Sequence, residues 1–328
     1  MRRLGLLLPL LFPLLWGCTG SQEPPLPALV AAGGEGEVRF YRARDLQGGT
    51  ALPVTAWSTP DLQDLAYSNA LGTLFLLFPD RVEAYPTQGF TENAAPQGTP
   101  TLASLPADCA GGYLRLGQRA LLAHCPGAGR AFLLALPGLG TPQEADLTGL
   151  PLEARLALLP QGVLDLLGYL TREALGYRPP LDPGGTPRWE RPLDPLPAQD
   201  PFDLRTDGSR LLGLAATFQE VRLYTLQGND LQSRRVLGDF PGEARLALDP
   251  VGGVVVYGRG FQTLEPRDSG HRETFRTYTA GLVGQDAYLY LARGPALEVF
   301  DLFPSPPLLL RAVGLGFSPR SLAFIPVE

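Results

Sequence analysis

Short apolar runs separated by turn residues fill most of the chain. Runs such as LFLLF, LLGLAA and VVVYG are apolar at nearly every position, whereas VRLYTL and LEVFDL alternate apolar and polar residues. Gly, Pro, Asp and Asn lie between the runs. Continuous apolar runs are typical of strands buried on both faces, and alternating runs are typical of strands with one solvated face. The pattern therefore predicts an all-β protein.

This pattern repeats along the chain. The repeating units start 33 to 49 residues apart, at Asp64, Gly111, Ala154, Asp203, Ala244, Thr277 and Arg320. Each complete unit reads as a short strand, a turn, a very apolar strand, a second turn and an alternating strand. A period of about 40–50 residues with three or four strands is that of a β-propeller blade. We therefore expect a β-propeller built mostly from consecutive units.

The two ends of the chain together supply one more blade. The C-terminal RSLAFIPVE reads as a single strand, and the N-terminal ALVAAGGEGEVRFYRARDL reads as two strands that lack a first one. Pairing these segments would remove the open sheet edges that favour aggregation. We predict one propeller domain over residues 28–328 with seven blades, closed by this pairing. A proline-rich insertion at 178–202 leaves six or eight blades as alternatives.

Residues 1–17 differ from the rest of the chain. Arg2 and Arg3 precede a mostly apolar stretch at 4–16. As a helix, this stretch would span about 20 Å, which is too short for a bilayer core of about 30 Å. A basic start followed by a short apolar stretch is typical of a secretory signal peptide. We therefore expect the protein to be exported.

The residues LWGC, which end at Cys18, resemble a bacterial lipobox. The resemblance implies cleavage before Cys18 and lipid on its thiol, so that residues 18–27 form a lipidated tether. Two or three acyl chains anchor a protein stably, because each buried CH₂ contributes about 0.8 kcal/mol. We expect a membrane-anchored lipoprotein that faces the periplasm or the cell exterior, on either the inner or the outer membrane. The alternative is a plain secretory signal with an incidental cysteine.

Composition narrows the range of partners. The chain carries 27 basic and 33 acidic residues, and its net charge is −6. Every basic residue is an arginine, and the arginines form no basic run. This distribution argues against nucleic acid as a partner, and the absence of lysine excludes a phosphate-binding loop of the GxxxxGK type. We expect a monomer whose partners are unknown proteins of the cell envelope.

Only two cysteines follow Cys18. Cys109 and Cys125 flank GGYLRLGQRALLAH, which reads as a hairpin that turns near Gly117. The two cysteines would lie nearly opposite one another across this hairpin, and an exported compartment permits a disulfide. We predict a disulfide between Cys109 and Cys125, with two buried free thiols as the alternative.

The unit RTDGSRLLGLAATFQEVRLYTL resembles a repeat of the YVTN and lactonase-type β-propellers, which are WD40-like. It carries a turn at Asp207-Gly208, an apolar strand and an alternating strand. The stretch DPVGGVVVYGR, from Asp249, is a looser copy. The resemblance implies a fold and no activity, because propellers host enzymes, ligand binders and protein scaffolds.

Few residues suggest catalysis. The only two histidines, His124 and His271, lie in no HExxH motif, and no GxSxG motif occurs. We expect His124 to be a strand residue beside the disulfide and His271 to lie in a solvated polar loop. Propeller enzymes of the lactonase kind hold a metal ion in the central channel, and by that resemblance Asp64, Asp203 and Asp249 are candidate Ca²⁺ ligands. Turn formation explains these aspartates more simply, so we assign no catalytic residue, metal or cofactor.

The proline-rich insertion contains a candidate interface. Trp189 lies in its middle, flanked by Arg188 and Arg191. Tryptophan and arginine are enriched among the residues that dominate binding at protein interfaces, and prolines lower the entropy cost of ordering a loop. The alternative is a long interblade loop whose tryptophan packs on the propeller wall.

These features lead to three functional hypotheses from different classes. The first is a non-enzymatic protein-binding or scaffold module of the cell envelope. The second is a metal-dependent hydrolase of the lactonase kind. The third is a propeller that binds a sugar or another small ligand. The sequence identifies no partner, ligand or substrate.

Overall fold

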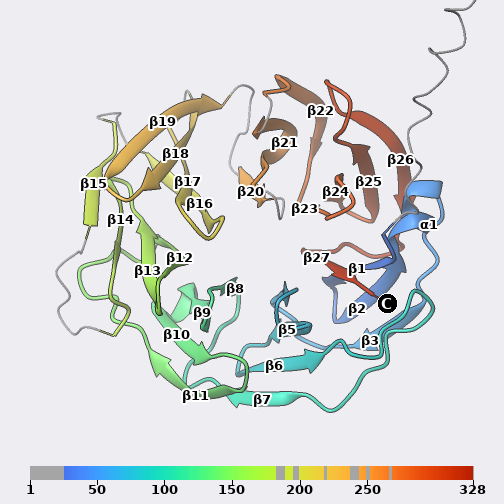
Figure 1. Ribbon diagram of the computed structural model, residues 1–328, viewed down its shortest axis with the longest axis horizontal. Coiled ribbons are helices and arrows are strands. Elements are labelled where there is room, and N and C mark those ends of the chain that lie inside the picture. The colour runs from blue at the N-terminus through green and yellow to red at the C-terminus, as the bar shows by residue number, and fades with distance from the viewer. Residues whose placement is uncertain are drawn as a thin grey trace, which may run out of the picture.

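Seven antiparallel sheets surround a common axis in the computed structural model of the protein (Figure 1). The structure describes residues 26–181, 189–194, 199–217, 220–236, 244–248, 252–265 and 268–327. The prediction of an all-β propeller with seven blades is confirmed. Within these ranges, no helix is long and apolar enough to cross a membrane. Cys18, Arg188 and Asp249 lie outside the described residues, so their suggested roles stay predictions.

The strands of blades 1 to 3 follow one another from the axis outward, four to a blade. Blade 1 consists of β27 (Ser321–Pro326), β1 (Ala28–Gly34), β2 (Glu37–Arg42) and β3 (Thr55–Ser58). Blade 2 consists of β4 (Asp64–Ser68), β5 (Thr73–Leu77), β6 (Arg81–Pro86) and β7 (Thr101–Ser104). Blade 3 consists of β8 (Tyr113–Leu116), β9 (Ala120–Cys125), β10 (Arg130–Ala135) and β11 (Leu139–Glu144). The helix α1 (Ala43–Gly48) follows β2, and the 3₁₀ helix η1 (Pro126–Ala128) follows β9.

Blades 4 to 7 follow the same order. Blade 4 consists of β12 (Arg155–Gln161), β13 (Leu164–Leu170), β14 (Ala174–Arg178) and β15 (Trp189–Pro192). Blade 5 consists of β16 (Asp200–Thr206), β17 (Leu211–Ala216), β18 (Val221–Gln227) and β19 (Asp230–Val236). Blade 6 has β20 (Arg245–Leu248), β21 (Val254–Glu265) and β22 (His271–Thr277). Blade 7 consists of β23 (Ala280–Val283), β24 (Tyr288–Arg293), β25 (Ala296–Asp301) and β26 (Leu308–Gly314).

The C-terminal strand closes the ring as predicted. β27 pairs with β1 in antiparallel register, from Ala28 opposite Pro326 to Gly33 opposite Ser321. All seven residues of β1 are buried, because its two edges pair with β27 and β2 and its two faces pack in the layers toward blades 7 and 2. The sheet edge that an unpaired β1 would expose is thereby covered.

The second strand of each blade is the most apolar because neighbouring blades pack against both of its faces. All six residues of β17 are buried. Leu212 belongs, with Val256, to the layer shared with blade 6, whereas Leu211 belongs, with Tyr177, to the layer shared with blade 4. The hydrophobic core is thus a series of layers between blades.

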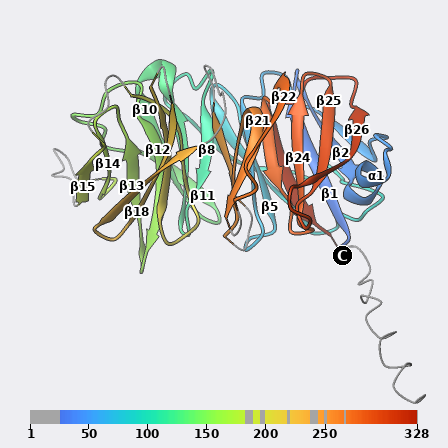
Figure 2. The ribbon, with the colours of Figure 1, turned by 90° about the horizontal axis from the view of Figure 1, so that it is seen from above.

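The inner strands run in one direction, which gives the ring two distinct faces. We call the face at which the inner strands begin the upper face and the face at which they end the lower face, as they lie in Figure 2. The backbone N–H of Val327 donates to the carbonyl of Pro27 at 3.0 Å, so both ends of the described chain lie at the lower face. Any segment that precedes residue 26 therefore joins the propeller on that face.

Two segments that we expected to be irregular contain strands. The proline-rich insertion supplies β15, the outer strand of blade 4, and β16 starts at Asp200, before the expected end of the insertion. His271 begins β22, so the expectation that it lies in a loop is wrong. Outer strands need little apolar surface because one side of them faces solvent, and their sequences therefore carry a weak strand signal.

The predicted disulfide between Cys109 and Cys125 is present. Cys109 precedes β8 and Cys125 ends β9, so the bond ties these neighbouring strands together at the upper face. Both cysteines are fully buried. The disulfide is thus an internal crosslink of blade 3, as the hairpin interpretation of its sequence requires.

Removing this disulfide is expected to destabilise the propeller. The double variant Cys109→Ala/Cys125→Ala should lose about 3 kcal/mol of unfolding free energy, because closing a loop of about 15 residues contributes that much in the chain-entropy model. Urea unfolding of the oxidised wild type and of the double variant measures the loss. Equal unfolding midpoints for the two proteins would contradict a stabilising role.

Candidate functional site

The inner strands share a short pattern at the upper face. Aligned there, blades 1 to 7 read SLAF, DLAY, YLRL, RLAL, DLRT, RLAL and AGLV. In blades 2 to 6 the second residue is a buried leucine and the first residue is polar, whereas the third residue is arginine in blades 3 and 5 and alanine in the others. We call the polar residues at these positions the axial cluster: Asp64, Tyr113, Arg115, Arg155, Asp203, Arg205 and Arg245.

Side chains at the first position accept hydrogen bonds from backbone N–H groups of the next blade. Each inner strand has a free edge toward the axis, and buried N–H groups on such an edge need acceptors. Asp64, Tyr113 and Asp203 each accept a hydrogen bond from the N–H of the second residue in the next inner strand, at 2.9, 2.9 and 3.0 Å respectively. These contacts link the inner strands of neighbouring blades through the axial cluster.

Arg115 reaches from blade 3 to blade 5 around the axis. Its Nη2 donates to Oδ1 of Asp203 at 2.8 Å, and its Nε donates to the carbonyl of Leu204 at 3.2 Å. Its guanidinium also stacks over the ring of Tyr113, 4.1 Å from the centroid. The side chains of Arg115 and Asp203 are only 11% and 4% exposed. This nearly buried ion pair therefore holds the cluster together and leaves little of Arg115 for a ligand.

The other three arginines of the cluster present positive charge at the surface. Arg205 donates through Nε to Asp203 at 3.2 Å, and Arg155 donates through Nε to the carbonyl of Pro201 at 3.1 Å. Among the residues that the structure describes, the terminal nitrogens of Arg155 and Arg205 have no hydrogen-bonding partner. Arg205 is 33% exposed, and Arg245 is exposed. With four arginines and two aspartates, the axial cluster has an excess of positive charge.

Burial and the charges of neighbouring groups shift the pKa values of several residues in the cluster. Burial alone would raise the pKa of Asp203, but Arg205 and Arg115 lower it to about 2. Burial raises the pKa of Asp64, against the opposing effect of the Leu114 N–H and Arg115. Burial and repulsion by Arg205 lower the pKa of Arg115. An anion beside Arg205 would relieve the repulsion between these arginines.

Two of the three aspartates considered as metal ligands, Asp64 and Asp203, already have other partners. Asp64 and Asp203 belong to the same cluster, but each carboxylate accepts two backbone N–H groups. Asp203 is also paired with Arg115 and Arg205. Across the described ranges, no three His, Cys, Asp or Glu side chains form a group suited to a metal ion. The surrounding arginines favour an anion over a cation at this place.

His124 lies directly behind the axial cluster, in β9. It is 3% exposed, its ring meets that of Tyr113 edge to face at 4.9 Å, and its Nδ1 has no hydrogen-bonding partner among the described residues. Burial, Arg115 and Arg155 lower the pKa of His124 to about 3. The expectation of a strand histidine beside the disulfide is confirmed, and its imidazole is neutral at pH 7.

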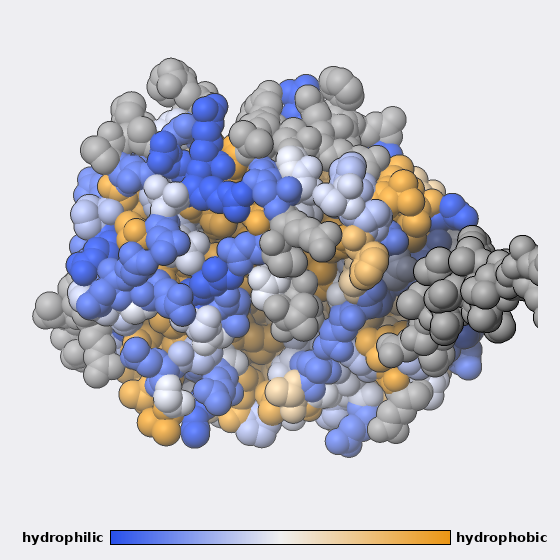
Figure 3. Space-filling model, turned by 45° about the horizontal axis from the view of Figure 1, so that its top comes forward, coloured by the Kyte–Doolittle hydropathy of each residue, from blue (hydrophilic) through white to orange (hydrophobic). Residues whose placement is uncertain are grey.

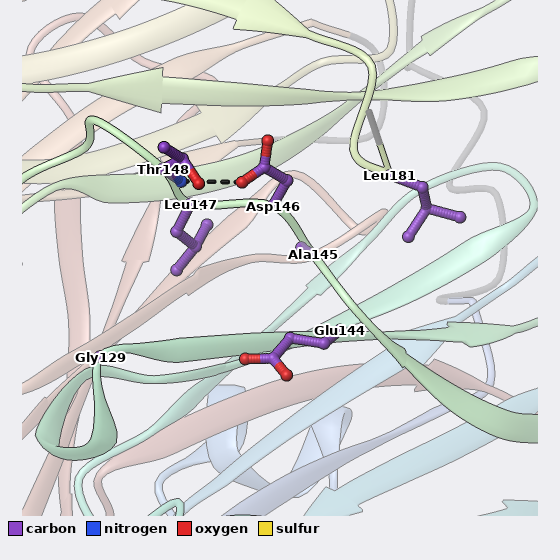
Figure 4. A pocket seen from close by; sticks show the side chains of 7 residues that line it. All are labelled: Gly129, Glu144, Ala145, Asp146, Leu147, Thr148 and Leu181. Carbon is purple, nitrogen blue, oxygen red and sulfur yellow. Dashed lines mark hydrogen bonds between the residues drawn. The ribbon is translucent and has the colours of Figure 1, made fainter. Parts of the chain in front are cut away.

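Blades 3 and 4 also border a side pocket. Its volume is about 480 Å³, and Figure 4 shows its lining residues Gly129, Glu144, Ala145, Asp146, Leu147, Thr148 and Leu181. A smaller cavity of about 70 Å³ shares Gly129 and Leu147 with it and extends to His124. The acidic side chains of the pocket are engaged: Glu144 pairs with Arg130 at 2.5 Å, and Asp146 accepts the N–H of Thr148 at 2.9 Å. The axial cluster, with its unpartnered donors, is therefore the stronger candidate site.

The predicted interface residues Trp189 and Arg191 lie together on β15. Arg191 stacks on the ring of Trp189 at 4.5 Å and donates to the carbonyl of Asn229 at 3.1 Å. Trp189 is partly buried against the hydrophobic layer between blades 4 and 5. These residues thus lie on the outer wall of the ring, far from the axis, and their role as an interface stays a prediction.

From the sequence alone, Asp64 and Asp203 are recognisable as inner-strand residues, but the four arginines are missed. A signal for them exists in the repeats. Two inner strands read RLAL and start with an arginine, and two others have an arginine as their third residue. Aligning the repeats on their buried leucine places all four arginines at the same end of the ring.

Comparisons with known proteins support the fold and leave the function open. No protein-family profile matches the chain, and no curated protein matches its sequence. A solved structure of a "putative 6-phosphogluconolactonase" from Bacteroides uniformis is similar over 92% of this chain and 100% of its own, with a TM-score of 0.67 and 13% identity. A second protein so named, from Bacteroides fragilis, covers 92% and 98% with a TM-score of 0.66 and 12% identity. AztD from Citrobacter koseri covers 93% and 98% with a TM-score of 0.59 and 12% identity.

Proposed function

We propose that the protein is a lipid-anchored, extracytoplasmic binding module that holds a small anionic ligand at the axial cluster. The observation that carries this proposal is the excess of arginine, with the terminal nitrogens of Arg155 and Arg205 unpartnered among the described residues. Arginine recognises phosphate and carboxylate groups through paired N–H donors. The ligand class is therefore a small molecule that carries a phosphate or a carboxylate.

The cluster is suited to binding because it is fixed before a ligand arrives. Asp203 positions Arg205 directly, and the pair of Asp203 with Arg115 is nearly buried. Strands of the inner ring carry all of these residues. Charged contacts contribute most to affinity when the side chains that make them are already ordered before the ligand binds.

Binding without turnover is favoured over hydrolysis. Two solved structures named as putative 6-phosphogluconolactonases share the fold at 12% and 13% identity, which supports only a weak analogy with their reaction. A general base works best with a pKa near the working pH. The pKa of His124 is about 3 and that of Asp203 about 2, so neither is tuned for that role at neutral pH. Burial raises the pKa of Asp64, but both oxygens of its carboxylate already accept backbone N–H groups, from Leu65 and Leu114.

A protein-binding or scaffold role ranks behind the small-ligand role. Its candidate surface contains Trp189 and Arg191, which are engaged with each other and with the wall of the ring. The tryptophan of this candidate interface is partly buried on the propeller wall, as the alternative interpretation of the sequence predicts. Among the described residues, nothing else on the surface around Trp189 and Arg191 indicates which class of partner would bind there.

Arg205→Gln is expected to weaken ligand binding at least about tenfold, because a hydrogen bond to a charged group contributes about 1.5–3 kcal/mol. Calorimetric titration with glucose 6-phosphate, glucose, citrate and inorganic phosphate measures the effect. The wild type should bind the charged compounds and not glucose. Arg44→Gln removes a half-exposed arginine of α1 on the lower face and should leave binding unchanged.

Two results would contradict this function. One is equal affinity for glucose and glucose 6-phosphate, which would show that negative charge is not recognised. The other is failure of all three charged compounds to bind the wild type. Equal weakening by Arg44→Gln and Arg205→Gln would place the binding elsewhere than the axial cluster.

A further inference from the structure

Exposed apolar side chains gather on the lower face, where blades 7 and 1 meet. Phe303, between β25 and β26, is 88% exposed, Leu52 after α1 is 72% exposed, and Leu308 is 54% exposed. We call the exposed apolar residues of this region the apolar patch: Leu26, Leu52, Phe303, Leu308 and Leu309. Isolated exposed leucines are ordinary on a protein surface, but a group of them with an exposed phenylalanine marks an interaction surface.

Hydrogen bonds tie the elements of the apolar patch into one surface. The N–H of Leu302 donates to the carbonyl of Ala287 at 3.2 Å, in the turn that follows inner strand β23. Gln47 of α1 donates to Asp286 in the same turn at 2.9 Å. Arg311 of β26 donates to the carbonyl of Gly48 at 3.5 Å. Figure 3, which views the lower face obliquely, shows hydrophobic side chains among polar ones on its right-hand side, the side of blades 7 and 1.

The chemistry of the patch suits a lipid surface. Residues 302–310 read LFPSPPLLL and contain no charge. Two exposed arginines lie near the patch. Arg311 donates to the carbonyls of Gly48 and Leu310, at 3.5 and 2.7 Å. Arg44 is paired with Glu92 at 3.1 Å and Asp45 at 4.0 Å, so a single arginine without an acidic partner among the described residues adjoins the apolar residues, and it forms no basic patch. Attachment through this surface would therefore depend on apolar insertion rather than on attraction to anionic lipids.

The position of the first described residue favours a membrane as the partner of the apolar patch. The described chain begins at the lower face, beside the end of β27. Only seven residues separate Cys18 from Leu26. Seven extended residues reach at most about 25 Å, so lipid on Cys18 would hold the lower face close to the bilayer.

We propose that the lower face rests on the membrane, with the apolar patch inserted among the lipid headgroups. The proposal rests on the lipid anchor of the proposed function and adds an orientation to it. The axial cluster, at the upper face, then points away from the membrane into the compartment from which a soluble ligand arrives.

A fluorescent probe on each face tests this orientation. Ser305, beside Phe303, and Ser58, at the upper end of β3, are exposed serines on opposite faces. In the full-length lipidated protein, Ser305→Cys or Ser58→Cys supplies the one free thiol, because Cys109 and Cys125 form a disulfide. Each variant is labelled with an environment-sensitive dye and reconstituted in phosphatidylethanolamine–phosphatidylglycerol vesicles that contain nitroxide-labelled lipids.

The label at position 305 should be quenched by the nitroxide lipids, and the label at position 58 should not. Adding Phe303→Ser to Ser305→Cys should lower the ratio of membrane-docked to undocked protein at least about tenfold, since burying a phenylalanine favours the docked state by that much or more. High salt should leave the quenching at 305 unchanged. The Cys18→Ala variant should stay in the soluble fraction in vesicle flotation.

The outcomes separate the orientation from the anchor. If the lipidated protein floats with the vesicles but position 305 is quenched no more than position 58, the orientation is overturned and the anchor is kept. If the protein with Cys18 intact stays soluble and is not lipidated, the anchor fails and the orientation fails with it. Quenching at 305 that persists unchanged in Phe303→Ser would overturn the role of the apolar patch.

Discussion

Replacing Asp203 with asparagine is expected to lower the free energy of unfolding by about 3–5 kcal/mol. Asp203 is 3% exposed, pairs with Arg115 at 2.8 Å and accepts the N–H groups of Leu204 and Leu246 at 3.0 Å each. Asparagine keeps the shape of the side chain but removes its charge. Arg115 then stays nearly buried without a counter-ion, and the new amide NH₂ faces an N–H donor. Unfolding in guanidinium chloride at pH 7 measures the loss.

Two further variants test whether the loss of stability comes from breaking the buried pair or from removing any acidic side chain. Glu144→Gln breaks the more exposed pair with Arg130 and should cost less than about 1 kcal/mol. Adding Arg115→Met to Asp203→Asn should recover part of the loss, because the uncompensated charge is removed as well. The role of the pair would be refuted if Asp203→Asn and Glu144→Gln had the same small effect.

Lowering the pH from 7 to 5 is expected to remove about 2 kcal/mol of stability through His124 alone. The pKa of a histidine is 6.5 in the unfolded chain and about 3 for His124 in the folded protein, because of burial, Arg115 and Arg155. Between these values the unfolded chain binds one more proton than the folded protein. The contribution is therefore complete above pH 6.5 and is lost as the pH falls toward 3, by about 5 kcal/mol in total.

The His124→Phe variant isolates this contribution. Phenylalanine fills the same buried place beside Tyr113 but does not titrate. Denaturant unfolding at pH 7, 6 and 5 should show the wild type losing stability faster than the variant, whatever their difference at pH 7. Parallel losses in the two proteins would mean that His124 is protonated in the folded state, and the account of its burial would be wrong.

The fold was predictable because a propeller repeats its physical requirements. Each blade needs one strand that is apolar on both faces, and the run at Leu211–Ala216 shows this directly. Each repeat also needs turns at a regular spacing, which the chain provides from Asp64 onward. The lone C-terminal strand and the two-strand N-terminal segment predicted the closure that β27 and β1 form. By contrast, β15 and β22 were missed because outer strands need little apolar surface.

The candidate site was less predictable because its contacts join distant blades. Arg115 and Asp203 are 88 residues apart in the chain and two blades apart in the ring. Repeat spacing shows that both lie at the upper end of inner strands, but it does not show that one side chain reaches the other around the axis. Asp203 was recognisable as an inner-strand residue, whereas its pairing with Arg115 and Arg205, which excludes a simple cation site, required the structure.

Anomalous diffraction from crystals soaked in tungstate tests most directly whether an anion binds at the axial cluster. Tungstate has the shape and charge of a small oxyanion and is located by its own scattering. We expect the strongest anomalous peak beside the terminal nitrogens of Arg205, and loss of that peak in Arg205→Gln crystals. Peaks at arginines outside the axial cluster, with none beside Arg205, would contradict anion binding at the axial cluster.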